Sequence, residues 1–280
     1  MGNRILRREQ LAPQVLRYRI DAPRIARKRK AGQFIILRAT TDGERIPLTI
    51  ANADAGEGWL EIIFQVVGHG TTHLAALGEG QELADLVGPL GKPTHVEKFG
   101  RCLAIGGGVG IAPLYPIVCA LKQAGNHVTT VIGARSANIL ILEREMAAQS
   151  DQLLVATDDG SKGHHGFVSD VYKKLVAEGA RFDYAVIIGP AIMMKVTAAL
   201  TVQAGIPTWV SLNPIMVDGT GMCGGCRVTV HGKTKFACVD GPEFDASGVD
   251  WDELLKRLAG YRAFEKKTMD EHTCQLAKVS

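Results

Sequence analysis

The hydrophobic pattern of this 280-residue chain changes near residue 100, and this change limits the folds that the chain can adopt. Before it, the apolar runs Val15–Ile20, Phe34–Arg38 and Leu60–Val67 are separated by clusters of Gly and Asp. Val15–Ile20 alternates apolar and basic residues, which is typical of a half-buried strand. Short strands between such turns predict a small antiparallel β-barrel or sandwich, with Leu83–Gly91 as its last strand and turn.

Apolar strands and helical patterns alternate after Arg101. The expected strands are Cys102–Ile105, His127–Gly133, Leu153–Ala156, Ala185–Ile188 and Trp209–Leu212. The expected helices are Ala112–Gln123, Phe167–Glu178 and Ala191–Gln203. Strands that alternate with helices predict a parallel sheet covered on both faces, which indicates a nucleotide-binding α/β domain.

The pattern changes again at Asn213, where a segment rich in glycine and cysteine begins. It contains a hairpin-like pair, Arg227–Val230 and Lys235–Ala237, and Trp251–Gly260 is predicted to be a terminal helix. The sequence therefore predicts three domains, at residues 1–98, 99–212 and 213–280.

Composition and charge exclude several classes of protein. Hydrophobic residues make up 46% of the chain, enough for a buried core, and a net charge of +3 does not indicate nucleic-acid binding. No run of 18 apolar residues is present, so no membrane span is expected. The polar segment Met1–Gln10 lacks the apolar core of a secretory signal, and clustered cysteines then indicate metal or redox chemistry in the cytoplasm. The basic run Arg27–Lys30 is interpreted as a solvated face, with a docking patch for an acidic partner as the alternative.

The strongest motif lies in the tail and has the spacing D-x4-C-x2-C-x11-C, formed by Asp218, Cys223, Cys226 and Cys238. Plant-type 2Fe–2S clusters use C-x4-C-x2-C and a distant fourth cysteine, so the spacing predicts a cluster with an aspartate in the first position. Iron accepts a carboxylate oxygen, although thiolates are softer ligands. The alternatives are a zinc knuckle completed by His231, a structural cysteine cluster, or Cys274 as the fourth ligand.

A second motif is a glycine run that contains Gly106, Gly108 and Gly110 and lies between a predicted strand and a predicted helix. Glycines there let the backbone approach a pyrophosphate at the helix N-terminus. The alternative is a tight turn that binds nothing, and the acidic residue of the Rossmann fingerprint is missing. Arg135, after the next strand, contacts an adenosine phosphate or caps a helix, and the sequence leaves both interpretations open.

A third motif combines Arg45, Pro47, Leu48 and Thr49 with Gly70, Thr71 and Thr72. An arginine can neutralise a pyrophosphate, and a threonine can donate a hydrogen bond to a flavin ring nitrogen. In isolation these are ordinary residues of strand edges. Their order beside the other two motifs favours a flavin site.

Together the motifs resemble the ferredoxin–NADP reductase superfamily, over nearly the whole chain. Within it, the chain is similar to the small FAD/2Fe–2S subunits of NAD-dependent ferredoxin–NADP oxidoreductases (also called sulfide dehydrogenases) and to the related dihydroorotate dehydrogenase electron-transfer subunits. The segments that carry the resemblance are Ala31–Phe34, Arg45–Thr49, Gly70–Thr72, Gly88–Gly91, Gly106–Pro113, Gly189-Pro190 with Met193-Met194, and Asp218–Cys238.

The resemblance implies an antiparallel β-barrel that binds FAD, an α/β parallel-sheet domain that binds NAD(P), and a small C-terminal 2Fe–2S module. It implies FAD contacts from Arg45, Pro47, Leu48, Thr49, Gly70, Thr71 and Thr72, nicotinamide dinucleotide contacts from Gly106, Gly108 and Gly110, and cluster ligation by Asp218, Cys223, Cys226 and Cys238. No catalytic side chain is expected, because the flavin itself exchanges the hydride.

The implied function is hydride exchange between NAD(P)(H) and FAD, followed by passage of single electrons through the cluster. The acceptor would be a larger partner subunit that carries FAD and 4Fe–4S clusters, in a heterodimer that reaches ferredoxin indirectly and bifurcates electrons only with that partner.

Three departures from the family pattern bear on this interpretation. The spacing from Arg45 to Thr49 is one residue longer than usual, and Ile188 stands where a cysteine often precedes the Gly-Pro. Asp218 replaces the first cysteine of dihydroorotate-type subunits, which favours the ferredoxin–NADP type. The alternatives are a dihydroorotate dehydrogenase electron-transfer subunit, a zinc-stabilised nucleotide-binding protein without redox chemistry, and a self-sufficient flavin reductase with a structural tail.

Overall fold

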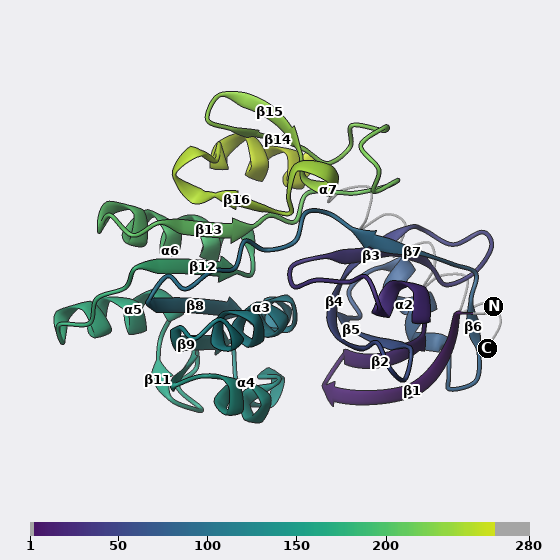
Figure 1. Ribbon diagram of the computed structural model, residues 1–280, viewed down its shortest axis with the longest axis horizontal. Helices are drawn as coiled ribbons and strands as arrows, with labels where there is room; N and C mark the ends of the chain where they lie inside the picture. The colour runs from purple at the N-terminus through teal and green to yellow at the C-terminus, as the bar shows by residue number, and fades with distance from the viewer. Residues whose placement is uncertain (1–2, 261–280) are drawn as a thin grey trace.

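The computed structural model describes residues 3–260 and contains two seven-stranded sheets that lie side by side (Figure 1). The strands of the first sheet are β1 (Asn3–Ala12), β2 (Val15–Asp21), β3 (Phe34–Arg38), β4 (Ile46–Asp54), β5 (Trp59–Gln65), β6 (Glu82–Leu83) and β7 (Asp85–Leu90). They pair in the order β6-β1-β2-β5-β4-β3-β7, and every pair is antiparallel. The sheet curls into a nearly closed barrel, which confirms the predicted fold of this part of the chain.

The alternation of side chains along β2 builds the barrel interior. Tyr18 and Ile20 are fully buried, whereas the alternating Arg17 and Arg19 keep part of their surface exposed. The Tyr18 hydroxyl donates to the carbonyl oxygens of Leu74 and Leu77, at 2.9 and 2.7 Å. These hydrogen bonds hold helix α2 (His69–Ala76) against the barrel; the short helix α1 (Pro23–Ala26) follows β2.

The second sheet is parallel except at one edge. Its strands are β8 (Arg101–Gly107), β9 (His127–Ala134), β10 (Gln152–Thr157), β11 (His164–His165), β12 (Tyr184–Ile188), β13 (Thr208–Ser211) and β16 (Glu243–Asp245). They pair in the order β11-β10-β9-β8-β12-β13-β16, and only the β13–β16 pair is antiparallel.

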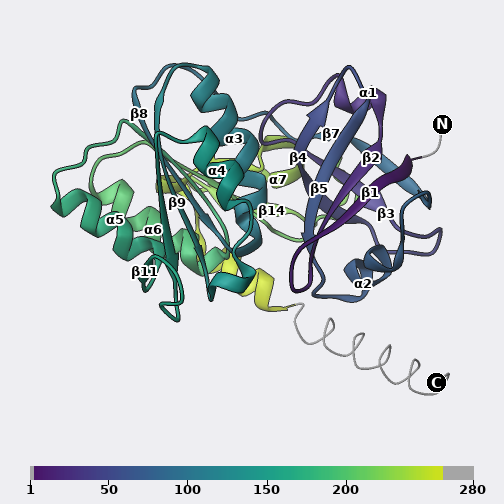
Figure 2. The same cartoon turned by 90° about the horizontal axis from the view of Figure 1, so that it is seen from below.

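Helices cover both faces of this second sheet (Figure 2). One face packs against α3 (Ile111–Gln123) and α4 (Glu143–Gln149), and the other against α5 (Val168–Ala177) and α6 (Ala191–Gln203). Along β8, Cys102 and Ala104 pack on the face covered by α3 and α4, whereas Leu103 and Ile105 pack on the face covered by α5 and α6. A strand buried on both sides is uniformly apolar, which is the sequence pattern that predicted the parallel sheet.

The C-terminal segment adds a small hairpin of β14 (Arg227–Val230) and β15 (Lys233–Phe236). The predicted second strand, Lys235–Ala237, begins two residues earlier and ends one residue earlier in the structure, because Ala237 opens the short helix α7 (Ala237–Asp240). Residues 251–260 are helical. In the part of the chain that the structure describes, no helix has the length and apolar character needed to cross a membrane.

Candidate cofactor and cluster site

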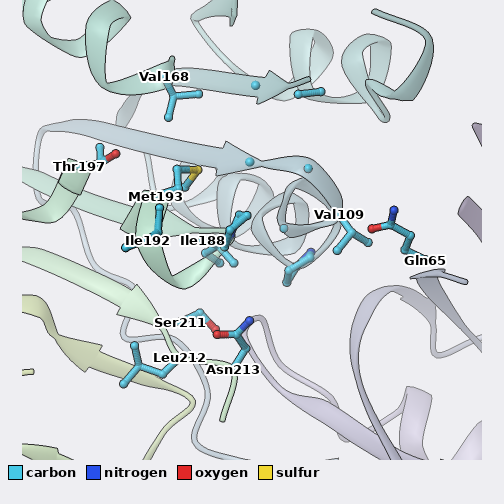
Figure 3. Close-up of a pocket in the computed structure, with 18 of the residues that line it drawn as sticks. Gln65, Val109, Val168, Ile188, Ile192, Met193, Thr197, Ser211, Leu212 and Asn213 are labelled. Atoms are coloured by element: carbon cyan, nitrogen blue, oxygen red, sulfur yellow. The ribbon is translucent and has the colours of Figure 1, made fainter. Parts of the chain in front are cut away.

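A cavity of about 1120 Å³ lies between the barrel and the parallel sheet (Figure 3). Phe34 on β3 and Pro47–Thr49 on β4 form part of its barrel side, and Gln65 at the end of β5 lies beside Val109. The carboxyl ends of β8, β9, β12 and β13 form its other side, which is where open α/β sheets bind ligands. Cavities for drug-sized ligands measure roughly 300–1,000 Å³, so this one has room for a dinucleotide or two adjoining ring systems.

The turn after β8 presents its backbone to the cavity. Gly108 and Gly110 line it, and Gly108 has a φ of +57° with no atom within 4 Å of a Cβ placed there. The turn leads directly into α3, so the positive end of the helix dipole lies at this wall. A Cβ on Gly110 would lie 2.7 Å from Cα of Gly189, so packing also requires this glycine. The predicted Gly106 does not line the cavity, and it packs against Leu114.

The far end of the cavity combines charged and apolar groups. Arg135 and Asp158, which follow β9 and β10, both line it. The N–H of Asp158 donates to the carbonyl of Ala134 at 3.1 Å, which joins the two turns. Phe167 and Ile192 also line the cavity and are 61% and 59% exposed. Exposed apolar walls beside a charged end suit a planar base attached to a ribose.

The residues of the predicted flavin motif lie in two separate places in the structure. Pro47, Leu48 and Thr49 line the cavity, whereas Arg45 and Gly70–Thr72 do not. The N–H of Gly70 donates to Oε2 of Glu44 at 3.0 Å, and the hydroxyls of Thr71 and Thr72 both donate to the carbonyl of Gly68. The structure thus brings Glu44 to the first turn of α2, next to the exposed Arg45.

The four predicted cluster ligands form two pairs. The Sγ atoms of the buried Cys226 and Cys238 are 3.2 Å apart. The Sγ atom of the exposed Cys223 lies 3.4 Å from Oδ1 of Asp218. Because a 2Fe–2S centre has two protein ligands on each iron, two neighbouring pairs fit its donor pattern. Among residues 3–260 no three His, Cys, Asp or Glu side chains meet at one metal position.

The Asp218 carboxylate also organises the loop that carries Cys223. It accepts hydrogen bonds from the N–H groups of Thr220, Met222 and Cys223, at 3.0 to 3.1 Å. Desolvation disfavours its ionised form, but the hydrogen bonds from Thr220 and Cys223 outweigh this effect and lower the pKa of Asp218 to about 2. Burial, reinforced by the neighbouring Cys226, raises the pKa of the Cys238 thiol to about 12. Metal ligands bind deprotonated, so the carboxylate is already in its binding form and the thiols must lose protons.

His231, the candidate fourth zinc ligand, is engaged elsewhere. Its Nε2 atom lies 3.1 Å from Oδ2 of Asp245, and its ring lies against Gly248. The other candidate ligand, Cys274, lies outside the described residues.

Several cavity residues carry no local motif. They are Gln65, Asp158, Phe167, Ile192, Ser211 and Asn213. They come from the ends of elements far apart in sequence, and only the rule that ligands meet the carboxyl ends of parallel strands could have indicated them.

Comparisons with known proteins agree with this geometry. The family model described as the iron–sulfur cluster binding domain of dihydroorotate dehydrogenase B matches residues 213–250, and the oxidoreductase NAD-binding domain matches residues 104–199. A Thermotoga maritima protein named as a homolog of the dihydroorotate dehydrogenase B (NAD(+)) electron transfer subunit is 52% identical, over 94% of this chain and 93% of its own. The corresponding electron transfer subunit of Desulforamulus reducens is 32% identical, over 86% of this chain and 95% of its own.

A solved structure of the NADH-dependent reduced ferredoxin–NADP oxidoreductase, studied for flavin-based electron bifurcation, contains a similar chain. It is 49% identical with a TM-score of 0.92, and the match covers 98% of both chains. The chain therefore belongs to the family of the dihydroorotate dehydrogenase B electron transfer subunits and their homologues, as an NAD-binding oxidoreductase subunit with an iron–sulfur module.

Proposed function

We propose that the chain exchanges hydride between NAD(H) and FAD and passes single electrons through a 2Fe–2S cluster to a larger partner subunit. The observation that carries this proposal is a single cavity lined by Pro47–Thr49 of the barrel and by the glycine turn at 108–110 of the parallel sheet. The paired cluster ligands lie on the segment that adjoins this cavity. The names of the similar proteins, an electron transfer subunit homolog and an NADH-dependent oxidoreductase, support the same function.

In this proposal, the residues of the chain bind and orient the cofactors. Bound FAD supplies the hydride acceptor and can release electrons singly, so no acid or base side chain is required. Pro47, Leu48 and Thr49 would hold the flavin ring, and Gly108 and Gly110 would let the nicotinamide dinucleotide approach the backbone. Their positions on opposite walls would bring the two rings together.

The remaining proposed ligands follow from the sequence motifs. Asp218, Cys223, Cys226 and Cys238 would hold the cluster. Arg45, Gly70, Thr71 and Thr72 would hold the FAD phosphates near α2, and Gly106 would support the turn that carries the dinucleotide-binding glycines.

We further propose NAD(H) as the preferred nucleotide. Asp158 lines the far end of the cavity, where the adenosine ribose would lie. In nucleotide-binding α/β domains a carboxylate at the ribose accepts a hydrogen bond from the 2′-hydroxyl, and it repels a 2′-phosphate. Arg135 lies in the same wall and would then meet the pyrophosphate side of the adenosine.

We propose the three domains at residues 1–98, 99–212 and 213–280, enzyme activity only as a subunit of a complex, and a cytoplasmic location. The partner would carry FAD and 4Fe–4S clusters and connect the chain to ferredoxin. A dihydroorotate-oxidising partner is the second candidate, favoured by the names of several relatives, and isolation of the native complex would distinguish the two.

Rapid anaerobic mixing of the purified chain with NADH tests the proposal. The flavin absorbance should bleach first, and the electron paramagnetic resonance signal of a reduced 2Fe–2S cluster should follow. Cys226→Ser should remove the cluster signal and leave flavin bleaching intact, whereas Cys119→Ser, a cysteine on α3, should change neither. Retained electron transfer to a one-electron acceptor in Cys226→Ser would instead favour a self-sufficient flavin reductase.

A further inference from the structure

Two hydrogen bonds clasp the segment after β7 to the segment after α7. The N–H of Lys92 donates to the carbonyl of Gly241 at 2.6 Å, and the Thr94 hydroxyl donates to Oε1 of Glu243 at 2.5 Å. Lys92 and Thr94 connect the barrel to the parallel sheet. Gly241 and Glu243 follow the helix that carries Cys238. The clasp therefore joins the cluster segment to the connection that leaves the barrel (Figure 1).

Gly32 makes room for this clasp. A Cβ on Gly32 would collide with Oγ1 of Thr94 and with Oε1 of Glu243. The N–H of Thr94 also donates to the carbonyl of Ala31 at 2.9 Å, so the loop before β3 is part of the same junction. This loop leads to Phe34, which lines the barrel side of the cavity.

Close packing continues the junction to the cavity wall. A Cβ on Gly91 would lie 2.8 Å from the Phe34 ring and 3.1 Å from the carbonyl oxygen of Gly241. Gly91 thus lies between Phe34 and Gly241, where a larger side chain would not fit. From Cys238 to the proposed flavin wall, the connection runs through groups in direct contact.

The Glu243 carboxyl is not needed to form its own strand. Backbone pairing with Ser211 places Glu243 in β16, opposite β13. Removing a carboxyl from water costs free energy unless it is hydrogen-bonded, and an apolar side chain would fill the same place at lower cost. The hydrogen bond that Glu243 accepts from Thr94 offsets this cost, so the contribution of the carboxyl lies at the junction and not in the pairing of β16.

We propose that Glu243 is a positioning residue that fixes the separation between the cluster and the flavin. Its hydrogen bond to Thr94 holds the Cys238 side of the cluster module against the barrel connection. This inference rests on the proposed function, and it concerns the electron step from flavin to cluster. The hydride step from NADH to flavin depends on the nucleotide-binding wall of the cavity, so Glu243 should not affect it.

Rapid anaerobic mixing of the flavin- and cluster-loaded chain with NADH separates these two steps. In Glu243→Ala and Thr94→Val the flavin should bleach at a rate within about twofold of the parent. Appearance of the reduced-cluster signal should slow by about tenfold or more, since a misplacement of about 1 Å between reacting groups can cost up to roughly 100-fold in rate. Glu243→Gln keeps an oxygen that accepts from Thr94, so it should restore most of the rate.

Asp252→Asn is the matched control, since Asp252 is an exposed acid of the same region that pairs with Lys195 at 2.6 Å. It should change neither step. Parent-like cluster reduction in both Glu243→Ala and Thr94→Val would overturn the inference, as would equal slowing in Glu243→Gln. If NADH fails to bleach the flavin of the parent chain, the proposed function fails instead, so the two failures are distinguishable.

Discussion

At the scale of single residues, Glu243 makes stability depend on pH. Burial of its carboxyl raises its pKa from 4.5 to about 7, with the Thr94 hydrogen bond opposing the rise, although the residue keeps some exposed surface. Folded protein then holds a proton that unfolded protein has lost, so stability falls as pH rises from about 4.5 to about 7. Burial, reinforced by the nearby Glu243 carboxyl, raises the pKa of the Tyr184 phenol above its usual value.

The variant Glu243→Gln should remove this dependence. Between pH 5 and 8 the parent should lose of the order of 2–3 kcal/mol of unfolding free energy relative to the variant, following about 1.4 kcal/mol for each unit of pKa. Denaturant unfolding at a series of pH values measures the difference. Parallel stability curves for the two proteins would show that Glu243 is ionised in the folded state.

Asp158 is the residue on which nucleotide choice should depend. Asp158→Ala should weaken NADH binding by roughly 10–100-fold, the equivalent of a lost hydrogen bond to a charged group. It should also reduce the difference in affinity between NADH and NADPH. Titration of the loaded chain with each nucleotide provides the measurement. Asp159→Asn is the control, because Asp159 carries the same charge but accepts hydrogen bonds from Ser161 at 2.6 and 2.9 Å. Equal effects of both variants would assign the preference to overall charge.

At the scale of elements, the first turn of α3 depends on its contact with the end of β12. Gly110→Ala would place a Cβ 2.8 Å from the carbonyl oxygen of Ile188, where backbone must move to accept it. Such overpacking should lower the unfolding free energy by about 1–3 kcal/mol and weaken NADH binding at the same turn. Thermal unfolding and nucleotide titration would show both effects. Gly78→Ala, whose nearest contact would be 3.6 Å, should be close to neutral, and equal losses in the two variants would contradict this packing argument.

Elements with strong periodicity could be predicted from the sequence, and others could not. The buried strands β8, β9 and β12 are mostly apolar, and α3 and α6 match the expected Ala112–Gln123 and Ala191–Gln203 within one residue at each end. Strand β1 was missed, because a strand with charged residues exposed along one edge resembles a polar terminus. Strand β16 has three residues and exists only because β13 offers an open edge.

The same division holds for the site. Local spacing predicts Cys223, Cys226 and Cys238 as cluster ligands, because residues that hold one cluster are often partly close in sequence. Spacing could not show that Glu44 rather than Arg45 meets the first turn of α2, since adjacent residues on an irregular segment have no fixed direction. Nor could it identify Asp158 or Glu243, whose partners come from distant elements.

At the scale of the whole molecule, the chain places its chemistry where its parts meet. The cavity lies between the two sheets, and β16 of the C-terminal segment completes the sheet of the central part. The hydrogen bonds at Lys92 and Thr94 add a second connection between that segment and the barrel. Because β16 and these hydrogen bonds join the C-terminal segment to the rest of the chain, we expect that segment to unfold together with the central sheet.

Cofactor analysis of the purified protein shows whether one chain carries both a flavin and a 2Fe–2S cluster. The absorption spectrum of anaerobically purified protein should be recorded with flavin, iron and zinc quantified on the same sample. We expect flavin bands with about two irons per chain, the content of a 2Fe–2S centre, and no stoichiometric zinc. Zinc without iron, or no flavin after reconstitution with FAD, would contradict the account and leave the family relationship as one of fold.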